Sequence, residues 1–138
     1  MRILRISAAV LILLMGSAGL AQQAAQNRYV AVIGTDGVQR VEITGGSYYF
    51  DPNHIVVKVN VPVVLVVKKA GGATPHSIFL KAPEAGIDFA ANLKTEPTNI
   101  SFTPTKVGTY PFWCTKRAPL SSKSHKDHGM TGVLEVVD

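Results

Sequence analysis

"VPVVLVVKKAGG", residues 61–72, is an almost unbroken run of valine and leucine followed by two lysines, an alanine and two glycines. β-Branched residues at this density favour a strand. With hardly any polar position, the strand is expected at the centre of a β-sandwich or buried on both faces. The glycine pair predicts a turn directly after it. This stretch therefore indicates a β-sheet protein.

Short strand patterns separated by turn residues continue on both sides of this run. Upstream, two β-rich runs flank Thr35-Asp36-Gly37, which predicts a hairpin-type turn. An aromatic strand then breaks at Asp51-Pro52-Asn53 before a β-branched strand begins. Further strands are expected over residues 76–80, 98–105, 108–114 and 132–138.

Helical patterns are almost absent from the chain. Only residues 84–92 could hold a helix, and it would be short. About eight to nine short strands with glycine and proline between them, and at most one short helix, are typical of an all-β protein. We therefore expect an antiparallel β-sandwich.

The N-terminal segment has the layout of a secretory signal. Two arginines precede an apolar run, residues 6–15, and small residues follow it. This predicts a signal peptide over residues 1–21, cleaved before Gln22, and one exported domain over residues 22–138. The alternative is an uncleaved anchor, but the apolar run is short for a membrane span. We expect no stable membrane insertion after cleavage.

The charges exclude one class of partner. The formal net charge is +5, but Lys68–Lys69 and Lys116–Arg117 are the only adjacent basic pairs. Scattered charge of this kind is a solvated surface, and we expect no nucleic-acid partner. A mildly basic surface remains compatible with an acidic protein partner.

The residues that can carry chemistry gather near the C-terminus. Cys114 is the only cysteine, so it is a buried small residue, an intermolecular link, a reactive thiol or a metal ligand. His125, His128 and Met130 follow it, and His76 begins an upstream strand. One thiolate, two imidazoles and a weak axial thioether are the ligand set of a blue-copper electron-transfer centre.

Four stretches carry a family resemblance, which runs from about Tyr48 to Asp138 and covers most of the predicted mature domain. They are "YYFDPNHIVVKVNVPVVLVV" (48–67), "TPHSIFL" (74–80), "GTYPFWC" (108–114) and "HKDHGMTGVLEV" (125–136). The sequence resembles cupredoxins of the plastocyanin, pseudoazurin and amicyanin type. The resemblance implies a Greek-key β-sandwich and a type 1 site with one copper ion. It also implies the ligands, which are His76, Cys114, one loop histidine and, in the axial position, Met130.

The spacing to the methionine separates the two loop histidines. In plastocyanin-like sequences the ligand histidine precedes the methionine by five positions, as His125 precedes Met130. His128 stands only two positions before Met130, which leaves little room for both side chains on one ion. We expect His125 as the ligand, with His128 as the alternative, near the mouth of the site.

The chain departs from this family in its ligand loop. Small cupredoxins place two to four residues between the cysteine and the histidine, whereas ten lie between Cys114 and His125. Trp113 stands where copper nitrite reductases have a histidine that bridges to a second copper. Ala118 stands where cytochrome oxidase subunit II has its second cysteine. The sequence therefore predicts a mononuclear site.

Strand alternation gives expectations for the neighbours of these ligands. Trp113 should face away from Cys114 into the core, and Phe112 should share the cysteine's face. Pro75 is the expected neighbour of the site, a donor to the cysteine sulfur is expected but not identified, and His54 should be exposed.

Three functions compete. The first is a periplasmic one-electron carrier from a bacterium, expected to be a monomer, not an enzyme, and to meet redox partner proteins, acidic ones included. The second is a copper-handling or copper-sensing protein with a non-blue site, in which the long loop lets His128 or water bind. The third, a Cys114 nucleophile with a histidine base, is disfavoured because no helix N-terminus or oxyanion feature accompanies the thiol.

Overall fold

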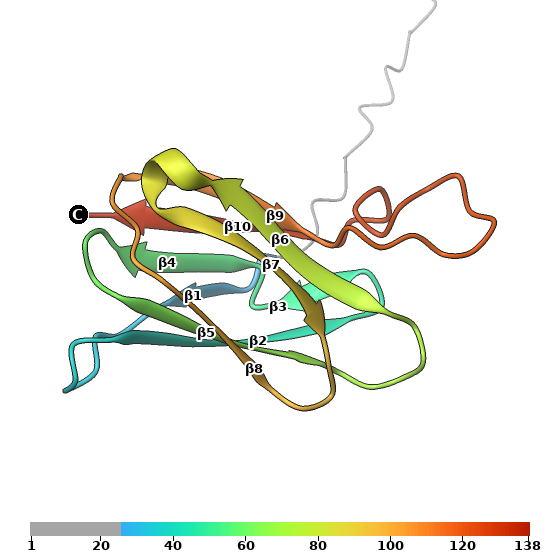
Figure 1. Ribbon diagram of the computed structural model, residues 1–138, viewed down its shortest axis with the longest axis horizontal. Helices are drawn as coiled ribbons and strands as arrows, with labels where there is room; N and C mark the ends of the chain where they lie inside the picture. The colour runs from blue at the N-terminus through green and yellow to red at the C-terminus, as the bar shows by residue number, and fades with distance from the viewer. Residues whose placement is uncertain (1–25) are drawn as a thin grey trace, which may run out of the picture.

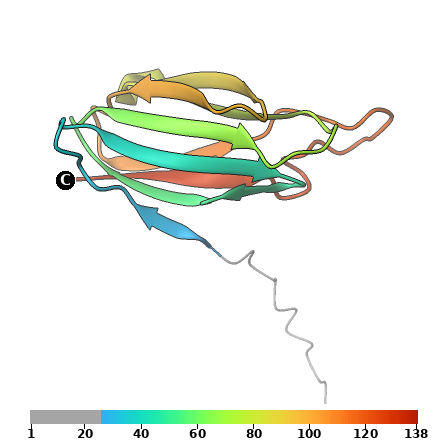
Figure 2. The same cartoon turned by 90° about the horizontal axis from the view of Figure 1, so that it is seen from below.

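The computed structural model describes residues 26–138, and the predicted signal peptide, residues 1–21, lies outside them. Within the described residues, ten strands form two sheets packed face to face, and the helical structure is one 3₁₀ turn, η1 (Pro83–Ala85). Figures 1 and 2 show the two layers, with the loop before the last strand extending beyond one end. The expectation of an all-β sandwich is confirmed, but both sheets contain parallel as well as antiparallel pairs, so the expectation of a purely antiparallel sandwich is wrong.

The strand order shows how the chain crosses between the layers. The larger sheet has the order β1-β4-β10-β9-β6-β7 and the smaller one β3-β2-β5-β8, which is a Greek-key sandwich. The strands of the larger sheet are β1 (Arg28–Val30), β4 (His54–Lys58), β10 (Thr131–Val137), β9 (Gly108–Trp113), β6 (His76–Ala82) and β7 (Ile87–Leu93). Those of the smaller sheet are β3 (Tyr49–Asp51), β2 (Gln39–Gly46), β5 (Val63–Lys69) and β8 (Thr98–Phe102).

The valine-rich run forms β5, at the centre of the smaller sheet between β2 and β8. Val63, Leu65 and Val67 are fully buried between the sheets, while Val64 and Val66 on the outer face are half-buried. Full burial of such a side chain contributes about 1.5–3 kcal/mol. β5 is therefore a central strand with one buried face, not a strand buried on both.

The hairpin predicted around residues 35–37 is wrong as a strand pairing. The turn forms, since Gly37 donates its N–H to the Gly34 carbonyl. However, β1 pairs in parallel with β4 in the larger sheet, and β2 belongs to the smaller one. Within the described residues, the β pairing between the two runs is a single antiparallel bridge, between Ile33 and Gln39. Parallel pairing with a distant strand leaves no local signal in the sequence.

The short helix that residues 84–92 could hold does not form. The chain makes the turn η1, passes Gly86 with a φ of 71°, and enters β7. Ile87, Phe89 and Leu93 are buried and alternate with more exposed side chains. This period of two is the strand pattern, and pairing with β6 along its whole length outweighs the weak helical preference of the alanines.

A close contact between β9 and β10 supports the end of the sandwich where the predicted ligands lie. Gly132 pairs with Phe112, whose buried ring occupies the space that a side chain on Gly132 would need. The Phe112 ring also meets Phe50 of the smaller sheet edge-on, with centroids 5.2 Å apart. As expected, Phe112 and Cys114 share the inner face of the larger sheet.

The variant Gly132→Ala should lower the free energy of unfolding by about 1–3 kcal/mol, the usual cost of overpacking a core. A Cβ there would press on the buried Phe112 ring and stand 2.8 Å from the Asn53 carbonyl oxygen. Urea denaturation of the metal-free protein measures the change. Thr131→Ala, an exposed position on the same strand, is the matched control. Equal stability of the two variants would show that the sandwich tolerates a side chain at residue 132.

Candidate metal centre

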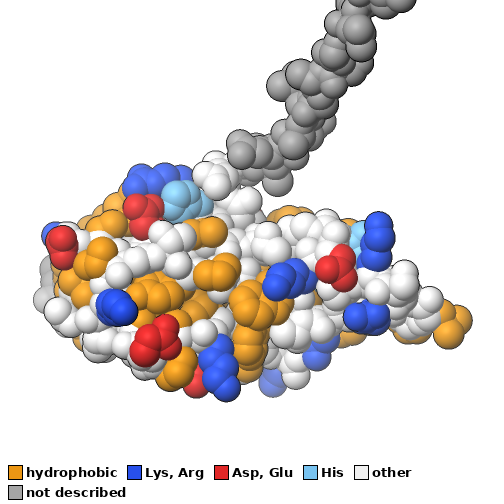
Figure 3. Space-filling view, turned by 90° about the horizontal axis from the view of Figure 1, so that it is seen from above, with side chains coloured by type: hydrophobic (Ala, Val, Ile, Leu, Met, Phe, Trp, Pro, Cys, Tyr) orange, Lys and Arg blue, Asp and Glu red, His pale blue; other side chains and the backbone are white. Residues whose placement is uncertain are grey.

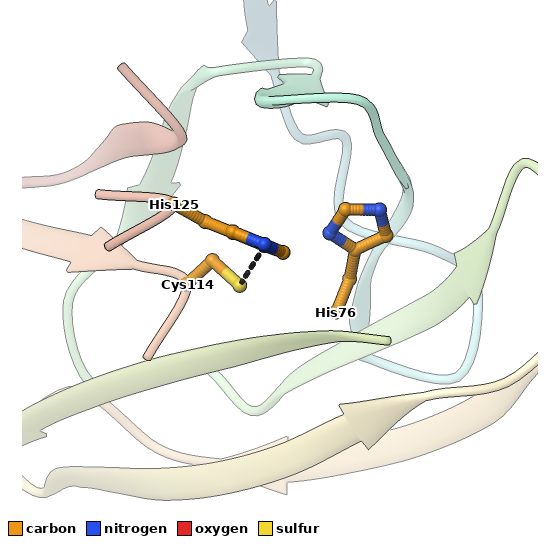
Figure 4. A group of neighbouring side chains, drawn as sticks. All are labelled: His76, Cys114 and His125. Atoms are coloured by element: carbon orange, nitrogen blue, oxygen red, sulfur yellow. Dashed lines mark hydrogen bonds between the residues drawn. The ribbon is translucent and has the colours of Figure 1, made fainter. Parts of the chain in front are cut away.

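Three buried side chains meet at one end of the sandwich. His76 begins β6, Cys114 directly follows β9, and His125 lies on the loop before β10. Their candidate ligand atoms all lie within 4.8 Å of one another. Figure 4 shows the two imidazoles and the thiol turned toward a common point. The exposed fractions are 3% for His76, 0% for Cys114 and 1% for His125, so bulk water does not compete for these atoms.

Backbone hydrogen bonds close the ligand loop. The Cys114 N–H donates to the Met130 carbonyl (3.1 Å), and the Met130 N–H donates to the His125 carbonyl (3.0 Å). The His125 N–H in turn donates to the Lys116 carbonyl (2.8 Å). Across this last bond, only Thr115 and Lys116 separate Cys114 from His125, although ten residues lie between them in the sequence.

The rest of the long insertion is a side loop, residues 117–124, with a closed neck. Arg117 and Ser124 form an antiparallel bridge at the neck. The Arg117 guanidinium donates to the Ser122 carbonyl (2.8 Å), and the Asp127 carboxylate accepts from the Ser124 N–H and hydroxyl (2.7 Å each). The side loop therefore holds its own shape, and Figure 1 shows this part of the chain projecting away from the sheets.

Ser77 supplies the donor to the cysteine sulfur, which the sequence alone does not identify. Its N–H points at the Cys114 Sγ (3.3 Å), and its hydroxyl lies 3.7 Å from the same sulfur. The Ser77 Oγ also accepts from the Thr115 N–H (3.0 Å). β6 and β9 are antiparallel with Phe79 opposite Trp113, so this register extends to Ser77 opposite Thr115. Pairing of β6 with β9, had it been known, would have identified the donor.

The imidazoles are poised to bind a cation through neutral nitrogens. Burial, the neighbouring His125 and Lys69 lower the pKa of His76, and burial followed by His128 lowers the pKa of His125. The His125 Nδ1 lies 3.5 Å from the Cys114 Sγ. The buried His76 Nδ1 has no hydrogen-bond partner among the described residues. A thiol beside two neutral imidazoles, each with a buried nitrogen that has no hydrogen-bond partner among the described residues, fits a soft or borderline metal such as copper.

The two remaining candidates lie in different surroundings. Met130 is fully buried, and its methyl group stands 3.3 Å from the position that a Cβ on Gly45 would take. His128 is exposed and stacks on Tyr48, with ring centroids 4.5 Å apart. The structure thus gathers His76, Cys114 and His125, places Met130 in the adjoining core, and leaves His128 outside the group.

Two neighbours differ from expectation. Trp113 faces outward as alternation requires, but the outer face of the sheet is half-covered surface, not core. There it lies between Phe79, with centroids 5.0 Å apart, and the Lys126 ammonium, 4.1 Å from its ring. His54 is half-buried and not exposed, because its Nε2 lies 2.7 Å from the Glu135 carboxylate on the neighbouring strand β10.

The match to a family model identifies the class of protein. A model for the cupredoxin-like domain matches residues 6–124, most of the chain. The chain therefore belongs to the cupredoxin-like family. The matched range ends one residue before His125. No protein of curated function matches the sequence.

Several solved structures share the fold of this chain. The metal-binding domain of the Cu(I)-exporting P-type ATPase CopA from Streptococcus pneumoniae, with Cu(I), has a TM-score of 0.60 at 20% identity, covering 83% of this chain and 100% of that one. Auracyanin from Roseiflexus castenholzii has a TM-score of 0.56 at 23% identity, covering 72% and 97%. Auracyanin A, a blue copper protein from Chloroflexus aurantiacus, has a TM-score of 0.53 at 22% identity, covering 73% and 100%. At these identities the likeness shows the fold alone.

The closed neck predicts that the side loop can be removed without loss of the centre. Replacing residues 118–123 with Asn-Gly, which suits a two-residue hairpin turn, should change the free energy of unfolding by less than about 1 kcal/mol. The amide resonances of Cys114 and Ser77 in the metal-free protein, and the copper stoichiometry, should stay as in wild type.

Deletion of Thr115 is the matched control. This residue lies between Cys114 and the neck, and its N–H donates to Ser77, so its removal should shift the same resonances strongly. If the loop replacement shifts them equally, the insertion is part of the metal centre and the neck does not isolate it.

Proposed function

We propose that the protein is an exported, monomeric one-electron carrier of the periplasm with a single type 1 copper site. The proposed strong ligands are His76, Cys114 and His125, and Met130 is the axial ligand. Copper held by one thiolate, two imidazoles and a weak thioether exchanges one electron between Cu(I) and Cu(II). The buried His76–Cys114–His125 group is the observation that carries the proposal.

The surroundings of the group suit electron transfer better than turnover of a substrate. Each side chain is held at a strand end or by the closed loop, so little rearrangement accompanies a change of charge. The Ser77 N–H directed at the Cys114 sulfur stabilises a thiolate and tunes the potential of the site. Because all three side chains are buried, no substrate reaches them directly, and we infer that the protein is not an enzyme.

Copper handling is the second candidate. The likeness of the fold to the metal-binding domain of a copper-exporting ATPase supports it. A long flexible loop would also favour it by letting His128 join the site, but the closed neck and the Tyr48–His128 stack oppose such movement.

Within residues 26–138 no helix is long and apolar enough to cross a membrane.

Visible absorption and EPR spectra with Cu(II) separate the two candidates. We expect an intense thiolate-to-copper band with narrow hyperfine splitting, absent from Cys114→Ser because the alcohol cannot replace the thiolate. His125→Ala should abolish or strongly alter the band, whereas His128→Ala, which removes a ring outside the group, should leave it in place.

Two results would contradict this assignment. A pale type 2 spectrum from the wild-type protein would favour copper handling over electron transfer. Disappearance of the band in His128→Ala together with its survival in His125→Ala would exchange the roles of the two histidines. Zinc accepts the same ligands, so the metal content is measured first.

We further propose that the redox partner is an acidic protein that approaches the loop end. Between Cys114 and Gly132 the sequence has one acidic residue, Asp127, and four basic ones, Lys116, Arg117, Lys123 and Lys126. In Figure 3, blue side chains are more numerous than red ones around this narrow end. A positive surface around the site raises the encounter rate with negative partners.

The rate of electron exchange with hexacyanoferrate, an anionic probe, should fall as salt rises, because screening shortens the reach of surface charge to about 10 Å at 0.1 M. Lys123→Glu should lower the rate at low salt and flatten the salt dependence. Lys81→Glu, near the far end of β6, makes the same charge change as a control. Equal effects of the two variants would mean that net charge, not the loop, governs the encounter.

A further inference from the structure

An aromatic lid, the ring of Tyr48, covers the outer side of the metal centre. Tyr48 lies in the turn between β2 and β3, and its ring meets the His125 ring nearly edge-on, with centroids 5.2 Å apart and planes at 80°. The same ring stacks on His128, with centroids 4.5 Å apart and planes at 26°. The tyrosine ring thus contacts both a buried imidazole and an exposed one.

The backbone shows that this position of Tyr48 is specified. Its φ of 64° lies in the left-handed region, which costs energy for a residue with a side chain and persists when surrounding contacts hold it. Tyr48 is 39% exposed, while His125 beneath it is 1% exposed, and the buried His125 Nε2 has no hydrogen-bond partner among the described residues. The ring of Tyr48 therefore forms part of the barrier between solvent and the centre.

We propose that copper reaches the centre past Tyr48, and that His128 is the first imidazole to bind it. This inference rests on the proposed copper site but not on its colour or redox role. His128 offers an exposed nitrogen ligand three residues after His125 and in ring contact with the lid. Tyr48 must turn aside before His125 can accept the ion, so it sets the rate of loading, and His128 raises the local ion concentration.

A hollow offers a rival path to the centre. It is lined by Ser47, Tyr49 and Thr74 and reaches His76. Figure 4 shows one ring nitrogen of His76 turned toward the centre and the other turned away. His76 is itself 3% exposed, and the hollow's lining contains no other imidazole, thiol or carboxylate among the described residues. An ion entering there meets no earlier ligand, which favours the Tyr48 side.

The lid is tested first in the metal-free protein, by diethyl pyrocarbonate modification and mass spectrometry. Trypsin cleaves after Lys123 and Lys126, so His125 and His128 fall in different peptides. We expect His128 to react and His125 to be protected in wild type. Tyr48→Asn, which suits a left-handed backbone, should make His125 reactive, and Tyr49→Asn should not. Equal reactivity of His125 in all three proteins would overturn the lid.

Loading is then followed by stopped flow with Cu(II) through the fluorescence of Trp113, the only tryptophan and the neighbour of Cys114. Tyr48→Asn should load faster by roughly two- to tenfold, the factor expected when one aromatic pairing no longer holds the ring closed. His128→Phe keeps a stacking ring but removes the nitrogen ligand, so it should load more slowly while His125 stays protected. Tyr49→Asn should load at the wild-type rate.

The outcomes separate this inference from the proposed function. Wild-type rates in both Tyr48→Asn and His128→Phe would overturn the inference, as would acceleration in Tyr49→Asn alone, which would favour the hollow. The fluorescence signal reports metal binding whatever the colour of the site. A pale wild-type spectrum would therefore reject the electron carrier and leave the access path to be decided by these rates.

Discussion

The backbone hydrogen bond from the Cys114 N–H to the Met130 carbonyl continues the β9–β10 ladder past its last strand pair, and the centre depends on it. It places the cysteine and methionine side by side before any metal is considered. The hydrogen bond from the Met130 N–H to the His125 carbonyl then fixes the backbone position of His125. His76 comes from β6, the strand next to β9. Because the fold has already ordered these side chains, little further ordering opposes metal binding.

The sequence predicts much of the fold and of the centre. The predictions that it gets wrong or misses have physical causes. Alternation identified the shared face of Phe112 and Cys114, and the valine-rich run identified a central strand. The segment that forms β7 was misread because its alanines suit helices while its pairing partner lies outside any local window. Ser77 was missed for a related reason, since its contact with the sulfur follows from the β6–β9 register, a property of the sheet.

The long insertion shows why residue counts can mislead about a metal site. Ten residues between Cys114 and His125 suggested altered geometry, but the His125–Lys116 hydrogen bond returns the chain to the starting point. The position of His125 relative to Cys114 depends on this hydrogen bond, which leaves only two residues between them, as in a much shorter loop. The side-chain hydrogen bonds of residues 117–124 are internal to the loop end, so we expect changes of length and charge there to leave the centre in place.

The position of Met130 has a consequence for the mechanics of the molecule. Its backbone lies directly before β10 at the edge of the larger sheet, but its methyl group rests against Gly45 of the smaller one, where a side chain would also collide with Leu93. The Met130 side chain therefore reaches from the edge of the larger sheet to the smaller one, so its position depends on the spacing of the two layers. With Met130 as the axial ligand, as we propose, compression or a slight slide of one sheet over the other would reach a bound copper ion as a change in its weakest bond.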